Sequence, residues 1–250
     1  LYTHLQDLFK EEEKKTFERL IERRISGEPL QYLLGHQEFW SIDLKVDPRV
    51  LIPRPETELL VEHALLLLGE TSSQGAPSVL EIGTGSGAIS IALARERKDL
   101  SVVATDISRE ALLLARENAL LAEVLSRIQF IQGDLLAPFR LSGEREPFDL
   151  ILSNPPYINR SEIRGLAREI KDHEPILALD GGEDGLDFYR KILSAAPSYL
   201  KKEGWLLMEV GQGQGKKVSE RIMREGRFHR PELVQDFSGI ERVVKAQRKG

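Results

Sequence analysis

The sequence contains no cysteine, which excludes disulfide bonds, thiolate metal ligands and cysteine nucleophiles. We therefore expect a reducing, cytoplasmic location. Long apolar runs are also missing: the longest, residues 64–68, is far too short to cross a bilayer, so no membrane association is expected. No signal peptide is visible, although the chain begins with Leu1 rather than Met.

Positive charge is not in excess, because the formal net charge is −5. Such a chain is no general nucleic-acid binder, and we expect no direct nucleic-acid partner. The histidines show no pair at the spacing of helical metal ligands, so no metal site is predicted. They lie scattered along the chain, at His4, His36, His63, His173 and His229.

What the sequence does have is enough apolar material for one large domain with a small appendage, with 250 residues of which 41% are hydrophobic. Apolar segments with strand and helix periodicity alternate along most of the chain, which predicts an α/β fold with a parallel sheet covered on both faces. The predicted strands are residues 79–82, 100–105, 128–132, 148–153 and 205–210, followed by a closing antiparallel pair at 230–237 and 240–245. Helices are predicted at residues 58–68, 108–121, 185–200 and 216–225, and another begins at Ala88.

The N-terminal part has a different character. Residues 1–27 predict a helix with an apolar face at Phe17, Leu20, Ile21 and Ile25. The helical cap is too small to bury much of a core alone, so we expect it to pack on the larger domain. A second short helix at 29–34 and a hairpin within 38–46 follow. We therefore divide the chain into an N-terminal helical domain (1–35), a hairpin linker (36–54) and a main domain (55–250), whose first helix Thr57 is expected to cap.

Glycines follow the first strand of the main domain and precede a helix, which is the layout of a nucleotide-cofactor site. Glycine permits close backbone approach and positive φ, and the helix start offers amide donors. Glu81 adds a carboxylate for an amine or hydroxyl of the cofactor. The loop itself comprises Gly83, Thr84, Gly85, Ser86 and Gly87.

The next strands also end in polar residues, and the carboxyl ends of parallel strands meet at one edge of a sheet. Asp106 is suited to accept hydrogen bonds from ribose hydroxyls, or else to cap a helix. Asp134, with the neighbouring Leu135, could meet an adenine ring, or else shape a turn.

The most specific signal follows the fourth strand, where Asn154-Pro-Pro-Tyr157 forms a stiff corner that is rich in acceptors. The Asn154 side-chain oxygen and the Pro155 carbonyl suit a substrate –NH₂ group, whose two hydrogens need two acceptors. Tyr157 could lie over a flat amide or base, next to Pro156. The alternative interpretation is a proline-rich turn without a function.

Taken together, Glu81-Ile-Gly-Thr-Gly-Ser-Gly87 and Asn154-Pro-Pro-Tyr157 resemble the S-adenosylmethionine-dependent methyltransferases that act on exocyclic or amide nitrogen. Within these, the sequence resembles the protein-(glutamine-N5) methyltransferases of peptide chain release factors (the HemK/PrmC family). That closer resemblance is carried by residues 27–32, Gly35, 39–40, above all 51–58, and also 173–175, 179–182 and 209–211. The family's helical domain is longer, so the N-terminal domain is expected to be truncated here.

The resemblance implies a seven-stranded, mostly parallel, Rossmann-like methyltransferase sheet. It also implies S-adenosylmethionine as cofactor, S-adenosylhomocysteine as product, and a class 1 release factor as partner, with its Gly-Gly-Gln tip as substrate. Asn154, Pro155 and Tyr157 would be catalytic, and with Pro156 they would bind the substrate glutamine. The cofactor would contact the glycine loop with Glu81, then Asp106, Asp134, Leu135 and Asn154, while Arg54 and Glu58 would lie near the mouth of the site; we expect a monomer.

Three alternatives remain at this stage. An adenine-N6 nucleic-acid methyltransferase would use the same acceptor corner. A NAD-dependent oxidoreductase would explain Gly83, Gly85, Ala88 and Asp106, since they also satisfy the loose dinucleotide fingerprint, but not the corner at Asn154. A catalytically idle binding module would bind cofactor without turnover.

Overall fold

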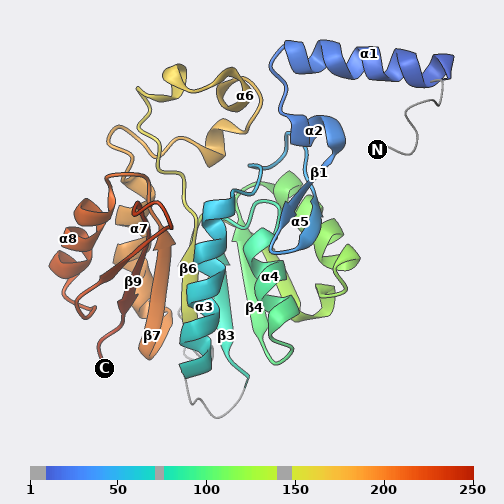
Figure 1. The fold of residues 1–250 in the computed structure, drawn as a ribbon. Coiled ribbons are helices and arrows are strands. Elements are labelled where there is room, and N and C mark those ends of the chain that lie inside the picture. Colours follow the sequence, from blue (N-terminus) through green and yellow to red (C-terminus); the bar gives the residue numbers. More distant parts are fainter. Residues whose placement is uncertain (1–9, 71–75, 140–147) are drawn as a thin grey trace.

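A seven-stranded sheet forms the centre of the protein, as shown by a computed structural model that describes residues 10–70, 76–139 and 148–250 (Figure 1). Its strands lie in the order β5-β4-β3-β6-β7-β9-β8. Their bounds are β3 Ser78–Ile82, β4 Ser101–Asp106, β5 Ile128–Gln132, β6 Phe148–Ser153, β7 Leu200–Glu209, β8 Glu232–Gln235 and β9 Glu241–Gln247.

The five strands from β3 to β7 run parallel, whereas β9 pairs antiparallel with β7, and β8 pairs antiparallel with β9. The predicted seven-stranded, mostly parallel sheet and its closing antiparallel pair are confirmed. The strand order reverses between β3 and β6, which are neighbours. Ligands of open α/β sheets bind at such a switch point, beyond the carboxyl ends of the strands.

Helices cover both faces of the sheet, because successive strand residues point to opposite sides. On one face, α3 (Glu58–Glu70) and α4 (Ala88–Glu96) share a core with Val79, Leu150 and Leu207. On the other, α7 (Asp187–Ala195) and α8 (Gly215–Glu225) pack with Leu80, Ile151 and Met208. The helix α5 (Arg109–Leu121) is capped by Ser108, whose hydroxyl accepts from the Ala111 amide.

The predicted helix–strand boundary near residue 200 is wrong. Helix α7 ends at Ala195, a short 3₁₀ turn η6 (Ala196–Ser198) follows, and β7 begins at Leu200 instead of Trp205. Pairing of Leu200 with Phe148 across a register shift extends the strand, which single-sequence periodicity does not show. Between β6 and α7 lies an insert of short helices: η4 (Ile163–Gly165), α6 (Arg168–Lys171) and η5 (Ile176–Ala178).

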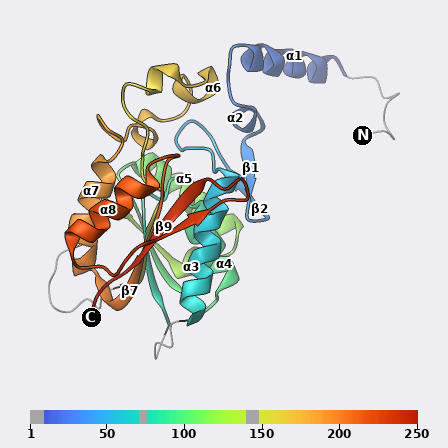
Figure 2. The same ribbon diagram turned by 60° about the vertical axis from the view of Figure 1, so that its left-hand side comes forward.

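The first described helix, α1 (Glu11–Ile25), projects away from the sheet (Figures 1 and 2). It has no buried residue, with Phe17 55% and Ile25 77% exposed, so α1 contributes no buried side chain to the expected packing of the helical cap on the larger domain. Contact with the main domain is made near its C-terminal end, where Arg24 pairs with Glu169 and Arg168 donates to the Ser26 carbonyl. Residues 1–9 of the predicted helix lie outside the described part of the chain.

The linker, by contrast, is firmly attached. Helix α2 (Leu30–Leu34) buries Tyr32 against residues of the linker and of α5. Strands β1 (His36–Phe39) and β2 (Ile42–Lys45) form the predicted hairpin, whose turn residues Trp40 and Ser41 both have positive φ. None of the helices in the three described ranges combines the length and the apolarity needed to cross a membrane.

One buried side chain connects the hairpin to the main domain. Asn118 of α5 accepts from the Lys45 amide at 2.9 Å and donates to the Lys45 carbonyl at 3.0 Å. The same amide group donates to the Ser86 carbonyl in the glycine loop at 2.9 Å. A single carboxamide therefore joins β2, α5 and the loop.

We predict that Asn118→Ala lowers the free energy of unfolding by about 2–4 kcal/mol, because it leaves the buried Ser86 carbonyl and the partly buried backbone groups of Lys45 without this partner. Chemical denaturation measures this difference. The neighbouring exposed substitution Glu117→Ala is the control and should change stability by less than about 0.5 kcal/mol. Equal stability of the two variants would contradict the role of Asn118.

Candidate active site

A cavity of about 320 Å³ opens at the carboxyl ends of β3, β4, β5 and β6. This is large enough for part or all of a small ligand, since such sites typically have volumes of about 300–1,000 Å³. Its wall contains most residues predicted from the sequence: Glu81, Gly83, Thr84, Gly85, Ser86, Asp106, Asp134, Leu135, Asn154, Pro155 and Pro156. The sheet thus brings together side chains that are up to 75 positions apart in the sequence (Glu81 to Pro156).

The glycine loop provides the floor of the cavity. Gly83, Gly85 and Gly87 all have positive φ, which side chains disfavour. A Cβ at Gly83 or Gly85 would project into open space, whereas one at Gly87 would press on Ile91 and Ala115. The first two glycines therefore leave room at the cavity, and Gly87, which is not part of its wall, permits close packing of α4 on α5.

Several backbone amides of this loop are already used within the protein. Gly83 and Thr84 donate to the Thr105 carbonyl at 2.8 and 2.9 Å. Gly85 donates to Asp106 Oδ2 at 2.9 Å, and Gly87 to the Thr84 carbonyl at 2.8 Å. These bonds hold the loop in shape before any ligand arrives.

Glu81 is a buried carboxylate in the cavity wall, only 1% exposed. Its Oε2 accepts from the Thr84 hydroxyl at 2.7 Å, from the Ser90 amide at 3.1 Å and from the Ser90 hydroxyl. Its Oε1 is buried and finds no partner among the described residues. Burial raises the pKa of Glu81 to about 7, although the Ser90 and Thr84 hydrogen bonds favour the charged form.

The acidic residues after β4 and β5 stand at the cavity in different ways. Asp106 accepts from the Gly85 amide through Oδ2 and from the Ser108 amide through Oδ1, both at 2.9 Å. Burial raises its pKa, while these backbone bonds lower it. Asp134 is exposed, and Leu135 beside it has a φ of 51°, a strained conformation for a leucine at the edge of the cavity.

Asn154 lies directly after β6, with Pro155 buried behind it. Its Nδ2 donates to the Thr57 hydroxyl at 3.2 Å, and that hydroxyl donates to Glu209 Oε2 at 2.7 Å. Thr57 was expected to cap α3, but its side chain points to Glu209 instead. Thr57 and Glu209 are not among the site residues predicted from the sequence. The pairing of β6 with β7 brings Glu209 beside Asn154, and hydrogen bonds connect Thr57 to both.

Tyr157 is not part of the cavity wall. Its ring contacts the core beneath α7 and α8 and packs so closely on Gly211 that a Cβ there would lie 2.9 Å from Tyr157 Cδ2. Burial, with a smaller contribution from the Glu209 carboxylate, raises the pKa of Tyr157 to about 12. The Tyr157 carbonyl accepts from Gln214 Nε2 at 2.8 Å. The described contacts therefore show Tyr157 supporting the corner from behind.

The rim joins the linker to the insert that follows β6. Arg54 lines the cavity and pairs with Glu174 at 2.6 Å, and the Glu174 side chain is buried. Glu58, expected at the mouth, instead accepts from the Trp40 amide at 2.7 Å and holds the hairpin turn. Other wall residues were not predicted from the sequence, among them Leu51, Pro53, Pro175, Leu177, Phe188 and Lys191.

The sheet, the glycine loop at its switch point and the amide corner after β6 together define a methyltransferase. The family model described as "Methyltransferase small domain" matches residues 57–183, and the one described as "PrmC N-terminal domain" matches residues 1–35. The crystal structure of a methyltransferase from Pyrococcus furiosus has the same fold, with a TM-score of 0.60 at 17% identity, covering 95% of this chain and 99% of that chain.

More narrowly, the chain belongs to the release factor glutamine methyltransferase family. It is 40% identical to the release factor glutamine methyltransferase of Bacillus cereus over 247 residues, which are 99% of this chain and 86% of the relative. The enzyme of the same name from Geobacter sulfurreducens is 44% identical over 244 residues, or 98% of this chain and 82% of the relative. The family resemblance read from the motifs is confirmed.

We predict that Glu81 makes folding stability depend on pH. Its pKa is about 7 in the folded protein and near its ordinary value of 4.5 when unfolded, so the folded state retains a proton between these pH values. The free energy of unfolding therefore falls as pH rises through this window, by about 1–3 kcal/mol from this group. Denaturation at pH 5 and pH 8 should show a smaller difference for Glu81→Gln.

The exposed substitution Glu110→Gln on α5 is the matched control and should retain the wild-type pH dependence. An unchanged pH dependence in Glu81→Gln would show that Glu81 is ionised at both pH values in the folded protein.

Proposed function

We propose that this protein transfers a methyl group from S-adenosylmethionine to the side-chain amide nitrogen (N5) of the glutamine in the Gly-Gly-Gln motif of a class 1 peptide chain release factor. Family membership supports the reaction class and the substrate. The observation that carries the proposal is the corner at Asn154. Its side-chain nitrogen donates to Thr57, and its oxygen, for which no partner is found within residues 10–70, 76–139 and 148–250, can accept from a substrate –NH₂ group.

The residues of the cavity fit the proposed cofactor. Gly83 and Gly85 leave open space where side chains would stand, and Glu81 presents a buried oxygen without a partner, suited to an ammonium or hydroxyl donor. Asp106 would hold the ribose through the oxygen lone pairs left by its backbone bonds, and Asp134 with Leu135 would contact the adenine. When bound, S-adenosylmethionine would supply a methyl group on a positively charged sulfur. The S–CH₃ bond would break as the N–CH₃ bond forms, S-adenosylhomocysteine would remain, and the methylated amide nitrogen would then release one proton.

The protein's own part in the reaction is orientation. An amide nitrogen is a weak nucleophile because its lone pair is delocalised into the carbonyl. The Asn154 oxygen and the Pro155 carbonyl would each accept one N–H hydrogen and so aim the nitrogen at the methyl carbon. Positioning of this kind supplies a large part of the rate without a strong base. Pro155 and Pro156 keep the corner rigid, with Tyr157 packed behind it.

The adenine-N6 reading uses the same corner, since adenine also presents a planar –NH₂ group. Family membership and the net charge of −5 favour the protein substrate. Membership of a methyltransferase family argues against a NAD-dependent oxidoreductase. A catalytically idle module would bind cofactor without transferring methyl, and the experiment below tests for this outcome.

We predict that Asn154→Ala reduces methyl transfer at least about a hundredfold, because the substrate nitrogen loses one of its two acceptors and its alignment. Its affinity for S-adenosylmethionine should remain within about threefold, below the effect of one hydrogen bond. Transfer of labelled methyl to release factor measures the first quantity, and calorimetry measures the second. Asn159→Ala, five positions further along, is the control, since the Asn159 side chain bonds within its own turn to Ser161.

Full activity of Asn154→Ala would remove the assigned role. Labelling of duplex DNA instead of release factor would establish the adenine alternative, and cofactor binding by the wild type without any transfer would establish the idle module.

A further inference from the structure

Three polar residues from distant parts of the chain, two of them buried, form a hydrogen-bonded row at the edge of the cavity. Asn154 follows β6, Glu209 ends β7, and Thr57 ends the 3₁₀ turn η2 (Pro55–Thr57). Strands β6 and β7 are parallel neighbours with Ser153 opposite Met208, so the next residues along, Asn154 and Glu209, come side by side. Thr57 and Glu209 are buried, Glu209 to 3% exposure.

The hydrogen bonds along this row have a defined direction. An ionised carboxylate can only accept, so the single hydrogen of the Thr57 hydroxyl is committed to Glu209 at 2.7 Å. The Thr57 oxygen then offers only lone pairs to Asn154, 3.2 Å away. The part of the Asn154 carboxamide that faces Thr57 must therefore be its –NH₂ group, and a hydrogen bond from Asn154 also stabilises the Glu209 carboxylate.

We propose that Thr57 and Glu209 are positioning residues that hold the Asn154 carboxamide with its oxygen toward the methyl-accepting –NH₂ group. This role rests on the proposed function. Thr57 and Glu209 would be the two residues that decide which end of the Asn154 amide meets the substrate. Neither residue needs to exchange a proton with the substrate for this role.

Loss of the row would allow the amide to turn over. A reversed Asn154 would present –NH₂ to the substrate –NH₂, so two donors would face each other and the acceptor would be lost. Since the two ends of a carboxamide have nearly the same shape, packing alone cannot select between them. Selection therefore depends on a neighbour that accepts and cannot donate, which an ionised Glu209 provides.

The charge state of Glu209 is set by groups from several elements. Burial raises its pKa to about 7, while Thr57, Arg242 of β9 and Asn154 lower it, and Glu56 of η2 raises it. Arg242 itself pairs with Asp236 at 2.8 Å. Tyr157 and Tyr189 also face this carboxylate, and its charge helps to raise both of their pKa values.

The first test removes the hydroxyl without changing the shape of the side chain. Thr57→Val should lower kcat for methyl transfer to release factor by about tenfold to hundredfold, the effect of poor alignment. Thr57→Ser, which retains the hydroxyl, should keep kcat within about threefold of wild type. Calorimetry with S-adenosylmethionine should give a Kd within about twofold for both, which also shows that both variants are folded.

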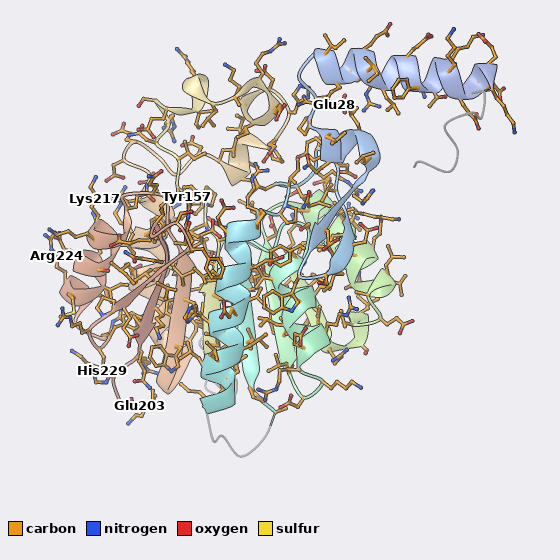
Figure 3. The ribbon with its side chains drawn as sticks, in the orientation of Figure 1. Glu28, Tyr157, Glu203, Lys217, Arg224 and His229 are labelled. Atoms are coloured by element: carbon orange, nitrogen blue, oxygen red, sulfur yellow. The ribbon has the colours of Figure 1, made fainter. Side chains whose placement is uncertain are left out.

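The second test changes the direction of hydrogen bonding between Asn154, Thr57 and Glu209. Glu209→Gln replaces one of two acceptor oxygens by a donor, so it breaks the bond from either Thr57 or Asn154, and kcat should fall by about tenfold or more with little change in the KM for release factor. Glu203→Gln, in the first half of β7, is the matched control and should be fully active. In Figure 3, Tyr157 lies near the end of the sheet that carries the site, and Glu203 lies far from it.

The pH profile gives a readout that a merely structural role would not move. With S-adenosylmethionine saturating, wild-type kcat should fall as pH drops through about 7, because protonated Glu209 acquires a hydrogen of its own to donate. This limb should be absent from Glu209→Gln.

The outcomes distinguish failure of the proposed function from failure of the positioning role. If wild-type protein transfers no methyl to release factor, the proposed function fails. If wild type is active and Thr57→Val is as active as Thr57→Ser, or Glu209→Gln retains wild-type kcat, the positioning role is wrong while the proposed function stands.

Discussion

The pairing of β3 with β6 is the constraint on which the site depends. These strands are neighbours although about 65 residues separate their ends, and the register places Ile82 opposite Ser153. The Ser153 hydroxyl donates to the Ile82 carbonyl at 2.7 Å, and these two residues are the last of their strands. One step further, the chain becomes the glycine loop on one side and the Asn154 corner on the other, so the proposed methyl donor and methyl acceptor meet at one switch point.

Two buried carboxylates flank this point, and both oppose stability near neutral pH. Glu81 stands at the end of β3 and Glu209 at the end of β7, each with a pKa raised to about 7 by burial. Neither makes only apolar contacts. Both accept hydrogen bonds at the cavity edge, Glu81 from Thr84 and Ser90, and Glu209 from Thr57. Acidic groups with strongly shifted pKa values are often found at ligand sites, where the arrangement of residues favours binding at some cost in folding stability.

The parts outside the sheet are held to the site by charged contacts. Arg54 of the linker meets Glu174 of the insert at the rim, and Arg24 of α1 meets Glu169 further out. The inner pair has a buried carboxylate, whereas both partners of the outer pair are largely exposed, and exposed pairs contribute little to stability. The linker is therefore anchored at the cavity, while α1 is attached mainly through its last turn and presents its apolar side chains to solvent.

Local pattern alone determined the alternating strands and helices, the glycine loop and the corner after Asn154, because glycine, proline and apolar periodicity act over a few residues. It could not determine that Glu58 holds a hairpin turn, that Tyr157 turns into the core behind the corner, or that α1 leaves its apolar face exposed. These depend on which segments become neighbours. The link from Asn154 through Thr57 to Glu209 is the clearest case: three ordinary residues, up to 152 positions apart, acquire a shared direction of hydrogen bonding only when β6 and β7 lie side by side.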